Sequence, residues 1–413
     1  MQVPTPKFSA KTFEIVRRTK RWSVENYHPY PVSVEDGEGV WLIDIEGNRF
    51  LDCLSCYSAV NFGYGHPKIM AAHARTARLP VLPRGAFYNS EVSWVYEELA
   101  GICPIPNPRV MPLNSGAEAV ERGIKFGRRW GYRKKGIKLG KAIPEIISIV
   151  NNFHGRTYGP LSLSSDEDYK EFGPFLPGIK KVPFGNINAL KAAITPHTVS
   201  VILEPVLGEA GAIVPYEGYL REVRELCTAS NVLMFVDEVQ TGFCRTGDLF
   251  AVNYEGIRPD GMFLGKALGG GVLKVSAVVV RAEVADLIKP GDDGSTFGGS
   301  PADAVVARAV FRVVSEERMA DKAREMGKYI LNGLRSINSS HVKEVRGRGL
   351  LIGIELNRSS PPARHFGDKL LLLNVAMKDT HKRVLRVAPP LIISKEEADF
   401  LLDRVEHVLT KAY

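Results

Sequence analysis

The sequence predicts an α/β protein with a large domain built on a mostly parallel sheet and a smaller α+β domain. The first observation is that short apolar runs rich in β-branched residues alternate with amphipathic helical stretches, which is typical of a parallel sheet covered on both faces. These runs are 146–150, 199–203, 233–236, 262–264 and 275–280. The second observation is a change of pattern after a long helix that begins at Pro301. With 413 residues, 45% of them hydrophobic, the chain is long enough for two domains.

Taken in order, the chain begins with a basic, amphipathic segment and a Pro-rich stretch, followed by a hairpin with strands at 40–44 and 49–51. Residues 55–67 mix glycine, aromatic and polar residues without periodicity, which is typical of a binding loop. Two helices are predicted from S-x-x-E capping boxes that start at Ser115 and Ser394. The remaining expected elements are a helix at 219–230, the helix from Pro301, and strands at 350–356 and 384–387.

Composition excludes several classes of protein. The net charge is +8, but the densest basic cluster, residues 128–141, lacks a nucleic-acid-binding motif, so we expect a solvated face and no nucleic-acid partner. No apolar run is long enough for a membrane span, and no signal peptide is evident, so we expect a cytoplasmic protein without membrane association. The five cysteines are scattered, which suits a reducing compartment. Cys53 and Cys56 form a lone C-x-x-C, which we interpret as two packed thiols and not as a metal site.

Two of the predicted strands end in chemically active residues. The run 233–236 breaks into Asp237, and the run 262–264 is followed by Lys266 and a glycine triplet. Because ligands of open α/β sheets bind beyond the carboxyl ends of the strands, we expect this acid and this lysine to face one crevice. An acid after four hydrophobic residues also holds magnesium in nucleotide hydrolases, but the phosphate loop G-x-x-x-x-G-K-[ST] that they need is absent. Alone, Lys266 could also be an ordinary solvated side chain, so its neighbours decide the interpretation.

Other segments bring polar and aromatic groups to the same edge of the sheet. Residues 115–117 open a helix, whose free N–H groups bind an anion or are simply capped. Further candidates follow two of the strands, namely Phe153, His154 and Arg156 after 146–150, and Glu204 and Glu209 after 199–203. His154 could also be a packing aromatic.

One cofactor accounts for this set of residues. Pyridoxal phosphate needs a lysine amine for its covalent link and a carboxylate that keeps its pyridine nitrogen protonated. It also needs an anion site for its phosphate and an apolar face against its ring. The amine, the carboxylate, the anion site and the apolar face would be supplied, in that order, by Lys266, Asp237, the helix start at 115–117 and Phe153. Arg156 would then bind a substrate carboxylate, for which its planar guanidinium is suited.

The chain resembles the class-III (ω-)aminotransferases of the fold-type-I pyridoxal-phosphate family. The motifs that carry the resemblance are FLDCLSCYSAVN, NSGAEA, NNFHGRT, EPVLGEAG, FVDEVQTGFCRTG, LGKALGGG, GSTFGGSP and RGRGLLIGIEL, which run from about residue 40 to the C-terminus. The resemblance implies a seven-stranded sheet and a homodimer with shared active sites. It also implies a large cofactor-binding domain at 61–308 and a small domain at 309–413, to which an N-terminal segment, 1–60, contributes.

The resemblance also implies a role for each matching residue. Lys266 is implied as the Schiff-base lysine and proton carrier, Asp237 as the partner of the pyridine nitrogen, and Gln240 as a contact to the ring hydroxyl. The other implied cofactor contacts are Ser115, Gly116, Ala117, Phe153, His154 and Val239, with Ser295 and Thr296 reaching the phosphate of the neighbouring subunit. The implied substrate contacts are Tyr57, Tyr88, Arg156, Glu209 and Arg386, the last two forming a glutamate–arginine gate.

The activity implied is that of the branch that transfers the terminal amino group of L-ornithine to 2-oxoglutarate, giving glutamate 5-semialdehyde and glutamate. Transfer from acetylornithine or 4-aminobutyrate is an alternative, because those enzymes share nearly every motif. An amino-acid racemase on the same scaffold is a second alternative, and a binding protein without turnover is a third. The sequence departs from the family pattern at Glu121, Arg122, Gly269, Lys274 and Ser300, none of which removes a catalytic group.

Overall fold

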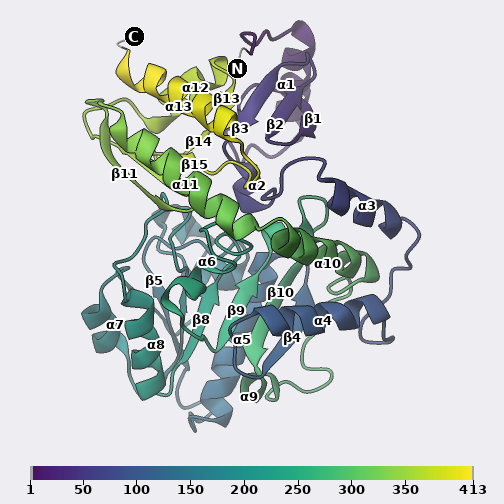
Figure 1. Cartoon of the computed structure of the whole chain (residues 1–413). Helices are drawn as coiled ribbons and strands as arrows, with labels where there is room; N and C mark the ends of the chain where they lie inside the picture. Colours follow the sequence, from purple (N-terminus) through teal and green to yellow (C-terminus); the bar gives the residue numbers. More distant parts are fainter. Residues whose placement is uncertain (1–2, 412–413) are drawn as a thin grey trace.

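The computed structural model describes residues 3–411, and its centre is a seven-stranded sheet in the order β4-β10-β9-β8-β7-β5-β6 (Figure 1). The strands are β4 (Pro108–Leu113), β5 (Glu145–Ile149), β6 (Ile179–Val182), β7 (Thr198–Leu203), β8 (Leu233–Asp237), β9 (Gly261–Leu264) and β10 (Ser276–Arg281). Neighbouring strands are parallel from β6 to β9, whereas β10 runs antiparallel to both β9 and β4. The mostly parallel sheet is therefore confirmed, with all five expected strands in place; the sequence does not predict β4 and β6.

Both faces of this sheet are buried, each in its own hydrophobic cluster. On β8, Phe235 belongs to the cluster that includes Trp130 of α5 (Gly116–Arg133), whereas Met234 and Val236 belong to the cluster that includes Val223 of α8 (Tyr219–Ala229). Burial on both faces explains why these strands are continuous apolar runs in the sequence. The other helices around the sheet are α3 (Pro67–Thr76), α4 (Ser90–Ile102), α6 (Tyr158–Leu163), α7 (Ile187–Ala193), α9 (Ala282–Ala285) and α10 (Pro301–Glu316).

Helix α5 begins where the capping box predicts. The Ser115 side chain accepts a hydrogen bond from the Glu118 N–H, and the Glu118 carboxylate accepts one from the Ser115 N–H at 3.2 Å. Gly123 lets the helix lie directly on β9, because a Cβ there would come within 2.2 Å of the Phe263 ring. The helix therefore points its N-terminus at the edge of the sheet where β8 and β9 end.

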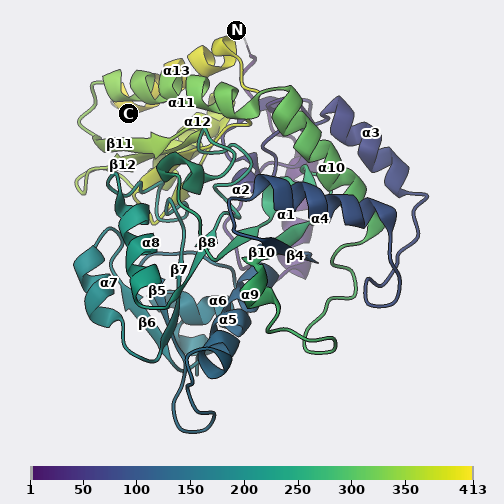
Figure 2. The same cartoon turned by 60° about the horizontal axis from the view of Figure 1, so that its bottom comes forward.

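The two ends of the chain fold together into a second unit (Figure 1, Figure 2). One of its sheets has the order β1-β2-β3-β13 and the other the order β11-β12-β15-β14. The strands are β1 (Val34–Glu38), β2 (Trp41–Asp44), β3 (Arg49–Asp52), β11 (Val342–Arg348), β12 (Leu351–Leu356), β13 (Val375–Ala376), β14 (Lys378–Thr380) and β15 (Val384–Val387). The helices are α1 (Ala10–Trp22), α2 (Ser55–Ser58), α11 (Met319–Ser336), α12 (Ala363–Leu372) and α13 (Lys395–Thr410). The predicted hairpin, both C-terminal strands and the final capped helix are confirmed.

A fully buried arginine ties the two units together. Arg245, which lies after β8, donates hydrogen bonds to Asn61 Oδ1 at 2.6 Å, to the Leu350 carbonyl at 3.0 Å and to the Pro389 carbonyl at 2.6 Å. Asn61 directly follows the N-terminal segment 1–60, and Leu350 and Pro389 belong to the C-terminal part of the chain. One side chain thus fixes three distant segments next to the sheet edge. None of the helices within residues 3–411 has the length and apolar character that crossing a membrane requires.

Candidate active site

The predicted acid lies at the end of β8, where its carboxylate is held from two sides. Asp237 is 5% exposed, and its Oδ1 accepts a hydrogen bond from the Val239 N–H at 3.0 Å. Its Oδ2 lies 2.7 Å from Nδ1 of His154, a buried residue of the segment after β5. The other ring nitrogen of His154 is buried and has no partner among the described residues. His154 therefore orients the carboxylate and is more than a packing aromatic.

The predicted lysine lies beside this acid at the end of the neighbouring strand. Asp237 is in register with Phe263 of β9, and Lys266 follows two residues after that strand. Burial lowers the pKa of the Lys266 amine, and the Arg386 guanidinium acts in the same direction, although Glu209 and Asp237 oppose the shift. A lowered pKa gives the lysine a larger neutral fraction, as a nucleophile or a proton acceptor needs.

A second buried acid follows β7. Glu204 accepts hydrogen bonds from the Phe153 N–H at 2.8 Å and from the Gly208 N–H at 3.2 Å. Burial raises the pKa of Glu204 to about 7, with Asp237 acting in the same direction. These bonds hold the segment that carries Phe153 and His154 against the end of the sheet.

The start of α5 completes one side of the site. The first N–H groups of a helix have no partner within the helix, so those of Gly116 and Ala117 can receive an anion. Gly116 packs on Val239, because a Cβ there would lie 2.8 Å from Val239 Cγ1. The backbone of Gly208 lies similarly close to the Gln240 side chain, where a Cβ would come within 1.7 Å of Oε1. The helix start, the acid and the lysine thus surround one space.

A glutamate–arginine pair lies near Lys266, with Glu209 in the segment after β7 and Arg386 on β15 of the second unit. Arg386 of β15 is 2% exposed and donates to Glu209 Oε1 at 2.6 Å. Burial raises the pKa of Glu209, but the charges of Arg386 and Lys266 outweigh it, so the net pKa lies below the usual value. The guanidinium carbon of Arg386 lies 4.7 Å from the centre of the Tyr57 ring. The structure therefore brings Tyr57, Glu209 and Arg386 together.

Arg156 is exposed and lies among three aromatic rings. Its guanidinium carbon is 5.6 Å from the ring of Tyr27, 5.8 Å from that of Phe153 and 5.7 Å from that of Tyr169. Tyr27 and Tyr169 are not among the residues predicted from the sequence, because neither stands next to a strand end. The aromatic residues of the Pro-rich stretch 27–31 are the only local signal for Tyr27.

Three of the predicted residues lie outside this cluster within one chain. Tyr88 is fully exposed and lines a surface cavity of about 620 Å³ together with Gly299 and Pro301. The Ser295 hydroxyl accepts hydrogen bonds from Asn114 Nδ2 at 3.1 Å and from the Gly298 N–H, and Thr296 is exposed. Tyr88 therefore shares a surface region with residues 299–301, whereas Ser295 lies beside Asn114, directly before the start of α5.

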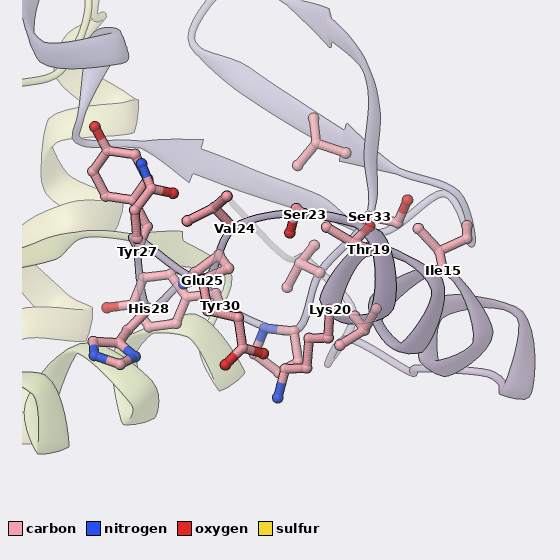
Figure 3. A pocket seen from close by; sticks show the side chains of 16 residues that line it. Ile15, Thr19, Lys20, Ser23, Val24, Glu25, Tyr27, His28, Tyr30 and Ser33 are labelled. Carbon is pink, nitrogen blue, oxygen red and sulfur yellow. The ribbon is translucent and has the colours of Figure 1, made fainter.

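Figure 3 shows a cavity of about 760 Å³ between α1 and the chain that follows it, lined by residues that include Lys20, Tyr27 and His28. Neither Lys266 nor Asp237 lines it. Tyr27 forms part of its wall while its ring also lies against Arg156. Neither of the two predicted catalytic residues thus lines the cavity, and Tyr27 connects its wall to Arg156.

Comparison with known proteins gives a consistent result. Residues 23–409 match the family profile described as aminotransferase class-III. An ornithine aminotransferase of Geobacillus sp. (strain WCH70) is 47% identical over 400 residues, which are 97% of this chain and 99% of the relative. A solved structure of ornithine aminotransferase from Toxoplasma gondii has a TM-score of 0.93 at 37% identity and covers 96% of this chain and 94% of that chain. An acetylornithine aminotransferase of Elizabethkingia anophelis has a TM-score of 0.86 at 36% identity, with 96% and 98% covered.

Proposed function

The chain belongs to the class-III aminotransferase family, and from that premise we propose that it transfers the δ-amino group of L-ornithine to 2-oxoglutarate, giving glutamate 5-semialdehyde and glutamate. It is a pyridoxal-phosphate-dependent aminotransferase. The observation that supports the choice of substrates is the pair of the half-buried Glu209 with the buried Arg386, beside Tyr57. A masked arginine suits an enzyme that takes an amine with one carboxylate in one half-reaction and a dicarboxylate in the other.

The residues present fit pyridoxal phosphate. The cofactor supplies an electron sink that stabilises negative charge on the substrate carbon. Lys266 would hold it covalently, and the buried Asp237 carboxylate, oriented by His154, would keep the pyridine nitrogen protonated. The helix start at 115–117, with the N–H groups described above, suits its phosphate. Phe153 and Val239 would border its ring, and Gln240 would contact the ring hydroxyl.

Lys266 would carry the proton during the reaction. Its amine must be neutral to accept a proton from the substrate carbon, and the lowered pKa supports that state. The orientation of the neighbouring Asp237 carboxylate is fixed, because one of its oxygens is bonded to the Val239 N–H and the other to His154 Nδ1. Proton transfer is therefore assigned to Lys266 Nζ and orientation to the Asp237–His154 pair.

The substrate would be held at its α-carbon end, which leaves the δ-amino group free to reach the cofactor. Arg156, with its aromatic neighbours Tyr27 and Phe153, would bind the α-carboxylate of ornithine, and Tyr57 would meet the α-amino group. Glu209 would keep Arg386 occupied during this half-reaction. When 2-oxoglutarate enters, Arg386 would leave Glu209 and bind the second carboxylate, for which a guanidinium is well suited.

We also propose a homodimer with shared active sites in the cytoplasm. Tyr88 and Thr296 are exposed in the single chain, which leaves them accessible to a partner subunit and supports a role for them at its site. The five cysteines are free, as a reducing compartment requires. We propose domain limits of 1–60, 61–308 and 309–413, with α10 running across the second limit.

The test is a panel of amino donors assayed with and without 2-oxoglutarate. Ornithine should be preferred over N-acetylornithine by about two orders of magnitude in kcat/KM, because acylation leaves the partners of the charged α-amino group unpaired. Equal use of both donors would favour an acetylornithine enzyme. Inversion of an amino acid without any keto acid would favour a racemase and contradict the proposal.

A further inference from the structure

The turn that carries Tyr57 has an unusual backbone. Ser55, Cys56, Tyr57 and Ser58, which form α2, all have positive φ angles, between 46° and 74°. Side chains other than glycine disfavour this left-handed region because Cβ approaches the backbone carbonyl. Four such residues in succession persist only when contacts outside the turn hold them in place.

Two anchors hold the turn. The first is Asp52, whose Oδ1 accepts hydrogen bonds from the N–H groups of Leu54 at 2.8 Å and Ser55 at 3.0 Å. Its Oδ2 accepts one from the Tyr64 hydroxyl at 2.8 Å. The carboxylate is 1% exposed, so these bonds are not exchanged with water. This anchor fixes the entry of the turn.

The second anchor joins the turn to the strand that carries Arg386. The Ser55 hydroxyl donates to the Ala388 carbonyl at 2.7 Å, and the Ala388 N–H donates to the Cys53 carbonyl at 2.9 Å. Ala388 lies directly after β15 and two residues after Arg386. In the turn, Tyr57 likewise follows two residues after Ser55. The hydroxyl of Ser55 therefore sets the position of the Tyr57 ring relative to the Arg386 guanidinium.

Arg386 has two restraints as a result, Glu209 at one end and the Tyr57 ring against its guanidinium. We propose that Ser55 is a positioning residue for the Glu209–Arg386 gate: it ties the left-handed turn to β15, so that Tyr57 holds Arg386 on Glu209. Ser55 itself touches neither Arg386 nor Glu209 among the contacts that the structure describes. This inference rests on the proposed function, because it concerns the arginine that would bind a dicarboxylate.

The turn provides a matched control. Ser58 is as buried as Ser55 and also has a positive φ, but its hydroxyl has no partner among the described residues. Ser55→Ala removes the hydroxyl bond of the second anchor and keeps its backbone bond, whereas Ser58→Ala makes the same chemical change in the same turn without removing a bond. A difference between the two variants therefore reports the loss of that bond and not the loss of a hydroxyl.

The experiment measures binding of glutarate and valerate to the holoenzyme by calorimetry. Both ligands have five carbons, but only glutarate has a second carboxylate for Arg386. In Ser55→Ala, Arg386 is held less firmly on Glu209, so we expect the preference for glutarate over valerate to rise by about 2- to 10-fold, the loss of one hydrogen bond. Ser58→Ala should keep the wild-type ratio within about twofold.

Several outcomes would overturn the inference. An unchanged ratio in folded Ser55→Ala, an equal change in both serine variants, or a parallel change in both affinities would leave Ser55 with a structural role only. Should Ser55→Ala fail to fold, Tyr64→Phe loosens the other anchor, and the same rise in ratio is expected; no rise there refutes the inference. A wild type that binds both ligands equally would instead contradict the gate in the proposed function.

Discussion

At the scale of single residues, Lys266 differs from the other lysines of its loop by its surroundings. Burial lowers the pKa of its amine, whereas Lys274, eight residues on, is exposed. In the apoprotein, the rate of acetylation of Lys266 should therefore rise with pH through an inflection below the ordinary lysine value of about 10.4. Mass spectrometry of peptides after brief treatment with acetic anhydride at a series of pH values measures this, with Lys274 as the internal control. An inflection at or above the ordinary value would contradict the assignment.

Glu238, the residue after Asp237, should make stability depend on pH. It is fully buried, bonded to the Thr241 hydroxyl and to the Val252 N–H at 2.9 Å, and burial raises its pKa from 4.5 to about 7. Between pH 4.5 and about pH 7, Glu238 is therefore protonated in the folded state and ionised in the unfolded state. The stabilising effect of this proton is lost as the pH rises through 7.

Glu238→Gln keeps the shape and cannot lose a proton, and its amide oxygen can still accept the hydrogen bond from the Val252 N–H. We expect the unfolding free energy of the variant, relative to that of the wild type, to be about 1–3 kcal/mol higher at pH 8 than at pH 5. Urea unfolding at the two pH values measures the difference. A difference that is constant with pH would show that Glu238 does not titrate in this range.

At the scale of elements, helix α5 connects three parts of the site. Its start is the proposed anion site, and two of the family departures lie on its next turn. Glu121 accepts from the Thr157 hydroxyl at 2.6 Å and from the Gly159 N–H at 3.1 Å, just after Arg156. Arg122 donates to the Gly294 carbonyl at 2.7 Å and pairs with Asp293 at 2.8 Å, just before Ser295. The departures therefore have structural partners on both sides of the helix.

Arg122→Gln should loosen the segment that leads to Ser295. The Arg122 and Asp293 side chains are only 14% and 6% exposed, so the pair is worth about 1–2 kcal/mol locally. Amide hydrogen exchange in residues 291–296 should become roughly 5- to 30-fold faster, while the core strands keep their protection. Arg133→Gln, an exposed change at the other end of α5, is the control. Unchanged exchange at 291–296 would show that other contacts hold the segment.

The sequence predicts those strands and site residues whose pattern lies within one short stretch of the chain. The strands β7, β8 and β9 are buried on both faces, so their apolar runs are visible, and the residues after them mark the catalytic edge. In contrast, β11 is half-exposed and charged, and β13 has two residues, so neither leaves a local pattern. Tyr27 and Arg156 are far apart in the sequence and meet only in the folded protein. The residues at strand ends therefore give no sign of this contact.

At the scale of the whole molecule, Arg245 is the residue on which the joining of the two units most depends. Arg245→Met is similar in volume but leaves the oxygens of Asn61, Leu350 and Pro389 buried without their donor. We expect a loss of about 3–5 kcal/mol in unfolding free energy, measured by urea denaturation. Arg324→Met, which removes a side chain that is 58% exposed, should cost less than about 1 kcal/mol. Equal losses would show that the buried arginine has no special role.

The pairing of β3 with β13 also sets an order of events during synthesis. The Asn374 side chain bonds to the Arg49 carbonyl across 325 residues, and Leu51 pairs with Val375 beside it. At ribosomal rates of about 5–20 residues per second, this edge of β3 therefore stays unpaired for roughly 16–65 s before β13 is synthesised. Throughout that time the nascent chain presents an open strand edge, the kind of surface that invites pairing with other chains. The N-terminal segment is thus translated long before β13 and is among the last parts to reach its native contacts, so a chaperone has most to protect there.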